Sequence, residues 1–254
     1  MRHLLTPEGQ LALAAAIALR PLLAFDFDGT LAPIVARPDD AHVPVAVLRR
    51  LGRLAELLPL AIITGRSVDD VRKRLTFEPR FIIGNHGAED PTDAAPATDS
   101  SVFAAFRDRL GTLANDLQSA GVTVEDKRHS IALHYRLARD PTCALTLIRQ
   151  LSANLDEGLS VHDGKRVVNI VADAAPDKAH ALAKLVRKCS ARSVVFVGDD
   201  LNDEPVFERA EPLWLTIRIG RDYSRTRARF FLDTTAEVVA LLERMLVLWN
   251  RQFG

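Results

Sequence analysis

Short apolar runs that end in polar residues and glycine place the strongest constraint on how this 254-residue chain folds. Three such runs, at 22–25, 60–63 and 81–83, alternate with stretches of helical periodicity in the first third of the chain. Fully apolar runs of this length are typical of strands in a parallel sheet, because helices cover both faces of such a sheet. We therefore predict an α/β fold with a doubly wound parallel sheet, which binds ligands at the carboxyl ends of its strands.

The rhythm of the sequence changes after the third strand. Residues 90–100 are rich in Pro, Ala, Thr, Asp and Ser, which is typical of a linker. The segment that follows predicts the order αββαββ, with the last two strands joined by a turn at Asp163-Gly164. The buried-strand pattern then returns. The sequence thus predicts a core formed by residues 1–92 and 174–254, with a smaller α+β cap domain, 93–173, inserted into it.

Charge and apolar length exclude several classes of partner. Thirty-three basic and thirty-three acidic side chains leave no net charge that could hold nucleic acid or an anionic membrane surface. The longest apolar run, 11–19, has nine residues, whereas a membrane span needs about 20. A signal peptide is the alternative for this run, but Thr6-Pro7-Glu8 before it is typical of the start of a helix. Two cysteines without metal-ligand spacing favour a reducing compartment, so we expect a cytoplasmic protein. We also expect a monomer.

Two carboxylates follow the first predicted strand. Alternation along the chain places Asp26 and Asp28 on one side, and Gly29 allows a sharp turn after them. Like charges about 4 Å apart cost about 4 kcal/mol at an effective dielectric of about 20, so such a pair needs a cation or a shared proton. A turn with a helix-capping aspartate is the alternative interpretation of this motif.

A second acidic motif, Gly-Asp-Asp-Leu-Asn-Asp at 198–203, follows the predicted strand at 193–197. Its carboxylates and Asp26 are expected at the same edge of the sheet, where Mg²⁺ is the cation that suits several oxygen ligands. The alternative is that Asp200 or Asp203 caps the helix that follows.

Three further residues could contact a phosphate. Thr64 offers a hydroxyl and Gly65 a backbone N–H at the end of the second strand, and Lys178 lies at the start of a helix, where the dipole favours anions. Most lysines in such positions are solvated, so a functional role for Lys178 is inferred only in combination with the aspartate motifs.

These motifs, in this order, resemble the haloacid dehalogenase-like (HAD) phosphohydrolases, whose core is Rossmann-like. Narrower matches resemble the trehalose-6-phosphate phosphatase family over nearly the whole chain, namely Thr64-Gly65-Arg66, Gly84-Asn85-His86-Gly87-Ala88-Glu89, Glu125-Asp126-Lys127 and Leu133-His134-Tyr135-Arg136. The resemblance implies Mg²⁺-dependent hydrolysis of trehalose 6-phosphate to trehalose and phosphate, the last step of trehalose biosynthesis. A small-molecule sugar phosphate is then the expected partner.

The resemblance also implies a role for each core residue. Asp26 would attack phosphorus to form an aspartyl-phosphate, and Asp28 would protonate the departing sugar oxygen and then activate water. Thr64 and Lys178 would stabilise the transferred phosphoryl group. The implied Mg²⁺ ligands are Asp26, the carbonyl group of Asp28, and Asp199, supported by Asp203.

In the predicted cap, Glu125 and Lys127 share one face of a strand, and Arg136 ends the next strand. Charged groups of both signs suit a sugar rich in hydroxyl groups, and a solvated surface is the alternative. The resemblance implies that these residues bind substrate together with Gly65, Arg66 and Asn169. A scaffold role is the alternative for Arg66 and is the expected role of His86.

The chain departs from the family pattern at Asn169, where a glutamate is usual. An amide replaces a carboxylate there, so phosphates of glucosylglycerol, sucrose or mannosylglycerate are alternative substrates, and an inactive sugar-phosphate-binding regulator is a further alternative. Five arginines near the C-terminus are expected to form a solvated basic face, namely Arg218, Arg221, Arg225, Arg227 and Arg229.

Overall fold

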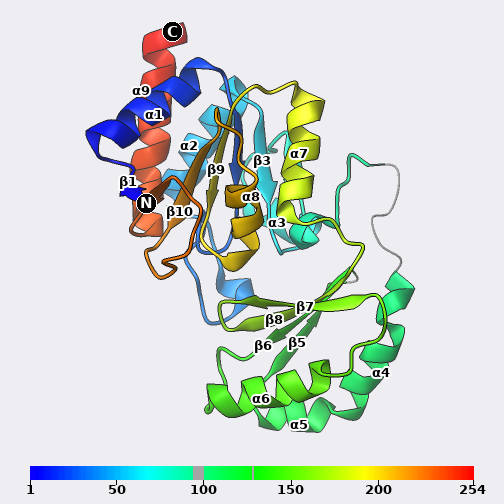
Figure 1. Cartoon of the computed structure of the whole chain (residues 1–254). Helices are drawn as coiled ribbons and strands as arrows, with labels where there is room; N and C mark the ends of the chain where they lie inside the picture. The colour runs from blue at the N-terminus through cyan, green and yellow to red at the C-terminus, as the bar shows by residue number, and fades with distance from the viewer. Residues whose placement is uncertain (94–99, 128) are drawn as a thin grey trace. The chain divides into compact units, whose positions relative to one another are not determined.

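The computed structural model describes residues 1–93, 100–127 and 129–254, and these fall into two compact units (Figure 1). The first unit comprises Met1–Thr92 and Asp177–Gly254, and the second comprises Asp93–Pro176. Most of the predicted linker, residues 94–99, lies outside the described residues. The assignment of the two units as a catalytic core and a cap stays a prediction.

A seven-stranded parallel sheet forms the centre of the first unit, in the order β1-β11-β10-β9-β2-β3-β4. Its strands are β1 (Arg2–His3), β2 (Leu22–Phe25), β3 (Leu60–Ile63), β4 (Phe81–Ile83), β9 (Val194–Gly198), β10 (Leu215–Ile219) and β11 (Phe230–Leu232). The predicted α/β class with a doubly wound parallel sheet is confirmed.

Helices cover both faces of this sheet (Figure 1). They are α1 (Pro7–Ala18), α2 (Val45–Leu57), α3 (Val68–Arg74), α7 (Lys178–Cys189), α8 (Glu204–Glu208) and α9 (Val238–Phe253), with short 3₁₀ helices η1 (Pro38–Asp40), η2 (Asn85–Gly87), η4 (Leu201–Asp203) and η5 (Thr235–Glu237). Thr6 caps α1, because its hydroxyl oxygen accepts a hydrogen bond from the Gly9 N–H. Among the described residues, no helix combines the length and the apolar character needed to cross a bilayer.

The burial of the strands explains their apolar sequences. In β2, Leu23 and Phe25 belong to the hydrophobic cluster shared with α1, α2 and α9, whereas Leu22 and Ala24 belong to the cluster shared with α7 and α8. Successive side chains point to opposite faces, so a strand covered on both sides needs apolar residues at every position.

The second unit is a four-stranded antiparallel sheet in the order β5-β6-β8-β7, with helices on one face (Figure 1). Its elements are η3 (Ser100–Phe103), α4 (Ala104–Thr112), α5 (Ala114–Ser119), β5 (Thr123–Asp126), β6 (Ser130–His134), α6 (Pro141–Ser152), β7 (Leu159–Gly164) and β8 (Val167–Ala172). Ile131, Leu133, Val168 and Ile170 pack against these helices. The opposite face of the sheet carries the polar side chains.

The predicted turn at Asp163-Gly164 is wrong. The ladder between β7 and β8 continues to the pair Gly164↔Val167, so the turn consists of Lys165 and Arg166. Arg166, the second residue of this turn, has a φ of 65°, in the left-handed region. Asp163 remains in the strand, where its carboxylate accepts hydrogen bonds of 2.6 Å from Arg149 of α6.

Candidate active site

Three buried carboxylates meet at the carboxyl ends of β2 and β9. These strands are neighbours in the sheet, so Asp26 and Asp199, which follow them directly, lie side by side. Asp203 of η4 joins them, and one oxygen atom from each of the three carboxylates lies within 4.8 Å of the others. Asp26 is 5% exposed, Asp199 1% and Asp203 0%.

Two glycines allow these groups to approach so closely. Gly29 has a φ of 79°, and a side chain on it would overlap the Asp199 carboxylate. A side chain on Gly198 would likewise overlap that of Asp203. The Asp203 carboxylate in turn accepts hydrogen bonds from the backbone N–H groups of Asp199 at 2.9 Å and Asp200 at 3.0 Å. Asp200 is the residue that caps η4.

Lys178 is the cation of this cluster. Its ammonium group lies 2.9 Å from Asp26 Oδ1 and 2.8 Å from Asp203 Oδ1. Burial alone would lower the pKa of Lys178, but the carboxylates of Asp203 and Asp26 raise it above its usual value. The pKa of Asp26 is also raised, mainly by burial and further by Asp203 and Asp199, while Lys178 opposes that rise.

Thr64 and Gly65 form a tight turn after β3. The Thr64 hydroxyl oxygen accepts a hydrogen bond from the Arg66 N–H at 3.2 Å. The motif at 84–89, which follows β4, is hydrogen-bonded to this turn. The Asn85 N–H donates to the Arg66 carbonyl at 2.9 Å, and the His86 N–H donates to the Thr64 carbonyl at 2.8 Å. The His86 ring packs against Gly65, where a side chain would overlap it. His86 therefore contacts this turn through both its ring and its backbone N–H.

Asp28 is paired with Arg66. Arg66 Nε donates to Asp28 Oδ2 at 2.6 Å, and Arg66 Nη2 donates to Asp28 Oδ1 at 2.7 Å. The Arg66 guanidinium also donates to the Asp70 carboxylate at 2.6 Å and to the Pro38 carbonyl at 2.9 Å. The carboxylates of Asp26 and Asp28 are thus neutralised by different cations, Lys178 and Arg66.

The polar face of the second unit carries the residues predicted to bind sugar. Glu125, Ala132, Asn169 and His162 face one another in register across the four strands, so they form one row on the face away from the helices. Asn169 is buried in this row, with an exposed fraction of 3%. The row combines a carboxylate, an amide and an imidazole, which offer hydrogen-bond donors and acceptors.

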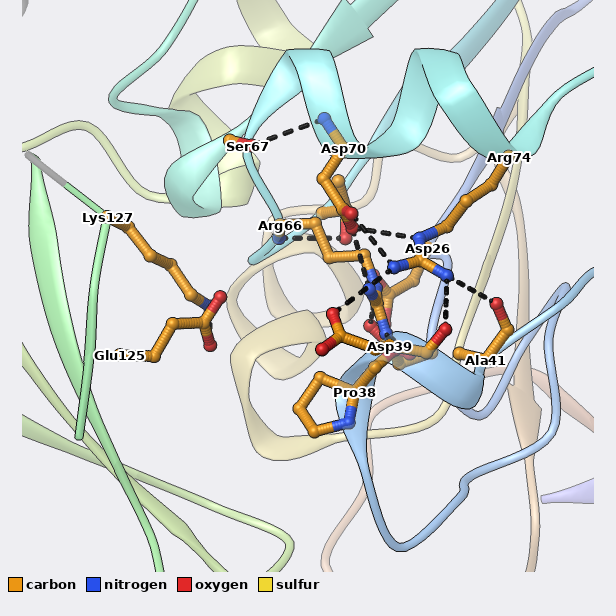
Figure 2. A network of polar contacts seen from close by, with 12 residues as sticks. Asp26, Pro38, Asp39, Ala41, Arg66, Ser67, Asp70, Arg74, Glu125 and Lys127 are labelled. Atoms are coloured by element: carbon orange, nitrogen blue, oxygen red, sulfur yellow. Dashed lines mark hydrogen bonds and ion pairs between the residues drawn. The ribbon is translucent and has the colours of Figure 1, made fainter. Parts of the chain in front are cut away.

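Glu125 is held by two partners on that face. His134 Nε2 lies 2.9 Å from Glu125 Oε2. Lys127 Nζ lies 3.5 Å from the same oxygen atom (Figure 2). Burial alone would raise the pKa of Glu125, but His134 and Lys127 lower it below its usual value. The Arg136 guanidinium donates a hydrogen bond to the Lys165 carbonyl at 2.6 Å in the β7–β8 turn.

The expectation of a solvated basic face is wrong for Arg218, whose exposed fraction is 1%. Arg218 of β10 pairs in register with Gly198 of β9, and its Nη1 donates to Glu204 Oε1 at 3.0 Å. Glu204 neutralises the guanidinium, which makes burial tolerable. The other four arginines are exposed, as expected.

Sequence reasoning missed Asp70, His134, Glu204 and the burial of Arg218 as parts of these networks. A signal existed for Asp70, since it lies four residues from Arg66 and from Arg74. The pairing of Arg218 with Glu204 had no local signal, because it depends on the neighbouring positions of β9 and β10 in the sheet.

Similar proteins share both the sequence pattern and the fold. The profile of the Trehalose-phosphatase family matches residues 24–235. A trehalose-phosphate phosphatase of Mycobacterium marinum is 31% identical over 246 residues, which cover 89% of this chain and 61% of that protein. A homologue of the same description in Mycobacterium avium is 33% identical, with 89% and 62% covered. This chain thus spans about three fifths of the length of these relatives.

Solved structures show the same architecture. The C-terminal domain of the Candida albicans trehalose-6-phosphate phosphatase has a TM-score of 0.77 at 21% identity and covers 95% of this chain and 97% of that one. A phosphatase of the haloalkanoate (HAD) superfamily from Bacteroides thetaiotaomicron has a TM-score of 0.59 at 17% identity, with 91% and 96% covered.

A parallel sheet with an antiparallel unit inserted into its sequence is the fold that this chain shares with these phosphatases. By its sequence, the chain belongs to the trehalose-phosphatase family.

Proposed function

We propose that this protein is a Mg²⁺-dependent phosphatase that hydrolyses trehalose 6-phosphate to trehalose and phosphate. The observation that carries the proposal is the buried cluster of Asp26, Asp199 and Asp203 around Lys178. The formal charges of three carboxylates and one ammonium group sum to −2, which is the charge that a divalent cation neutralises.

The donor set of this cluster suits Mg²⁺, a hard cation that binds carboxylate oxygens, water and substrate phosphate. Asp26, Asp199 and the carbonyl group of Asp28 would hold the ion, and Asp203 would support them by fixing Lys178 and the backbone at Asp199. When bound, Mg²⁺ supplies positive charge for the phosphoryl oxygens.

The side chains at the strand ends would divide the reaction into two displacements. In the first, an oxygen atom of Asp26 attacks phosphorus, the bond to the sugar oxygen breaks, and Asp28 gives that oxygen a proton. In the second, Asp28 takes a proton from water, which attacks the aspartyl-phosphate and frees Asp26. Lys178 keeps the Asp26 carboxylate in place, and the Thr64 hydroxyl and the Gly65 N–H donate hydrogen bonds to the phosphoryl group.

The polar face of the second unit is our candidate for sugar recognition. Glu125 accepts hydrogen bonds from sugar hydroxyls, Lys127 donates them, and Asn169 does both. Arg136 and Arg66 are already engaged by protein partners, so we assign them secondary parts in substrate binding. The amide of Asn169, where the family usually has a glutamate, favours phosphates of other glycosides as the alternative substrates.

The first test is phosphate release by the purified protein with and without EDTA, from trehalose 6-phosphate, sucrose 6-phosphate, glucosylglycerol phosphate, mannosylglycerate phosphate and glucose 6-phosphate. We expect EDTA-sensitive preference for trehalose 6-phosphate. Asp26→Asn, which keeps the size of the side chain, should abolish release while the circular dichroism spectrum is retained. Binding of sugar phosphate without release from any compound would instead indicate a regulator.

A second variant separates the two substrate assignments. Asn169→Glu restores the usual carboxylate, so it should raise kcat/KM for trehalose 6-phosphate if the rest of the sugar-binding face suits trehalose. If another glycoside phosphate is preferred by the wild type and Asn169→Glu does not move that preference, trehalose 6-phosphate is the wrong substrate.

A further inference from the structure

An alternating series of charges extends from Asp28 into α3. Arg66 pairs with Asp28 on one side, and its Nη1 donates to Asp70 Oδ2 at 2.6 Å on the other. Asp70 also accepts hydrogen bonds from Arg74, at 3.0 Å from Nε and 2.9 Å from Nη2 (Figure 2). Arg66 therefore lies between two carboxylates, and the Asp70 carboxylate joins the two arginines.

The far end of this series is anchored to the backbone. Arg74 Nη1 donates to the carbonyl groups of Ala41 at 2.7 Å and Asp39 at 3.1 Å. Ser67 caps α3 by accepting a hydrogen bond from the Asp70 N–H at 3.3 Å, which fixes Asp70 in the first turn of the helix. Asp70 is thus held in place by α3 and Arg74, and its carboxylate in turn holds the Arg66 guanidinium in place.

Arg66 is confined from the remaining directions as well. Its Nη2 donates to the Pro38 carbonyl at 2.9 Å, its guanidinium lies 5.3 Å from the centre of the Phe27 ring, and its side chain is 9% exposed. The Asp28 side chain is 42% exposed, so the guanidinium is the more confined member of the pair. Asp28 therefore takes its orientation from Arg66.

We propose that Asp70 is a positioning residue for Asp28 and acts through Arg66. In this arrangement both oxygen atoms of Asp28 accept hydrogen bonds from Arg66, so Asp28 must release one of them before it can exchange a proton with the sugar oxygen. Because the Arg66 guanidinium also pairs with Asp70, its attraction for Asp28 is weaker than that of a guanidinium with a single partner. The hydrogen bond to Asp70 also keeps the guanidinium from rotating. The proposal rests on the proposed function, because it assigns the acid role to Asp28.

Loss of the Asp70 charge has a defined consequence. Without the carboxylate of Asp70, Arg66 attracts Asp28 more strongly, and the guanidinium loses a charged hydrogen-bond partner. Both changes withdraw Asp28 from the departing oxygen. In the first displacement, the loss should affect substrates whose leaving group needs a proton, such as a sugar alkoxide, and not p-nitrophenyl phosphate, whose phenolate leaves without one. The second displacement is common to both substrates, so the comparison uses kcat/KM, which reports only the steps up to departure of the leaving group.

The test compares Asp70→Asn with Asp69→Asn, a matched control on the same helix whose side chain is 82% exposed. For Asp70→Asn we expect kcat/KM on trehalose 6-phosphate to fall about tenfold, a part of the roughly 10²–10⁴ that a general acid contributes. Its kcat/KM on p-nitrophenyl phosphate should stay at the wild-type value. Asp69→Asn should change neither rate constant.

A second comparison uses a variant in which the acid is already absent. Introduced into Asp28→Asn, the change Asp70→Asn should cause no further loss on the sugar phosphate, because the two residues act as one unit. Equal losses of kcat/KM on both leaving groups, or additive losses in the double variant, would overturn the proposal and leave Asp70 with a role in helix stability only.

These outcomes are distinct from failure of the proposed function. If the wild type hydrolyses p-nitrophenyl phosphate but not trehalose 6-phosphate, the assigned substrate is wrong. The comparison of Asp70→Asn with Asp69→Asn is then made with the sugar phosphate that the wild type does hydrolyse, where the same difference between leaving groups supports or overturns the role of Asp70.

Discussion

The ammonium group of Lys178 lies 2.9 Å from Asp26 Oδ1, and both side chains are almost completely buried. Lys178 is the first residue of α7, so the start of that helix places the cation next to the carboxyl end of β2. The same ammonium group contacts Asp203 at 2.8 Å. One lysine thus joins the candidate nucleophile to the acidic motif that follows β9, and it holds the Asp26 carboxylate from a buried position.

Replacement of this cation is our first prediction. Lys178→Met keeps the length of the side chain and leaves the carboxylates of Asp26 and Asp203 buried without their partner. We expect phosphate release to be lost and the free energy of unfolding to fall by about 3 kcal/mol, the usual cost of removing one member of a buried ion pair. Urea unfolding followed by circular dichroism measures this change. An unfolding free energy equal to that of the wild type would contradict the burial of an uncompensated charge.

The second prediction concerns metal binding without reference to activity. Mg²⁺ should raise the melting temperature of the wild type, because an ion that binds only the folded state stabilises it by mass action. Asp199→Asn removes one charged oxygen ligand, so the rise should be strongly reduced. Asp233→Asn, in a surface cluster with His3 and Glu237, is the matched control and should keep it. Equal rises in all three proteins would place the Mg²⁺ site elsewhere.

Local sequence signals predicted the architecture well, because buried parallel strands need apolar residues at every position. The acidic strand ends were predicted for the same reason: Asp26 and Asp199 follow strands whose carboxyl ends meet at one edge of the sheet. Thr6 at the start of α1 was predicted from its capping chemistry, which acts within four residues. These features depend on the chain immediately around them.

The partners of charged side chains were not predictable in this way. Arg66 lies 38 positions from Asp28, and Arg218 lies 14 positions from Glu204, so neither pair forms part of one helix or hairpin. Since most arginines in proteins are exposed, the sequence alone predicts a solvated side chain for an arginine such as Arg218. Only the register between β9 and β10 brings Arg218 beneath the acidic motif, and register is a property of the assembled sheet.

The burial of Arg218 leads to the third prediction. Arg218→Met leaves the Glu204 carboxylate, which is 10% exposed, without its charged partner. We expect the free energy of unfolding to fall by about 3 kcal/mol. Arg225→Ala, on an exposed position of the same C-terminal segment, should change it by less than about 0.5 kcal/mol. Urea unfolding of both variants measures the difference, and similar small losses in both would restore the interpretation of a solvated basic face.

The fourth prediction concerns Asp90, which lies near the end of the first segment of the parallel-sheet unit. Asp90 contacts Lys184 of α7 at 2.9 Å and accepts hydrogen bonds from the N–H and hydroxyl groups of Thr92 at 2.9 and 2.6 Å. Burial alone would raise the pKa of Asp90, but Thr92 and Lys184 lower it from 3.8 to about 2. The folded state therefore favours the ionised carboxylate more than the unfolded chain does.

A lowered pKa fixes the direction of the pH dependence. Asp90 contributes its full stabilisation above pH 3.8, the value without these partners, and loses it as the pH falls toward 2. Asp90→Asn should lower the free energy of unfolding at pH 7 by about 1 kcal/mol, since contact with solvent reduces the effect of the pair. Urea unfolding at pH 7, 5 and 3, with Asp69→Asn as the exposed control, should show this difference shrinking at pH 3. A difference between Asp90→Asn and the wild type that stays constant over this range would mean that the contacts of Asp90 do not depend on its charge.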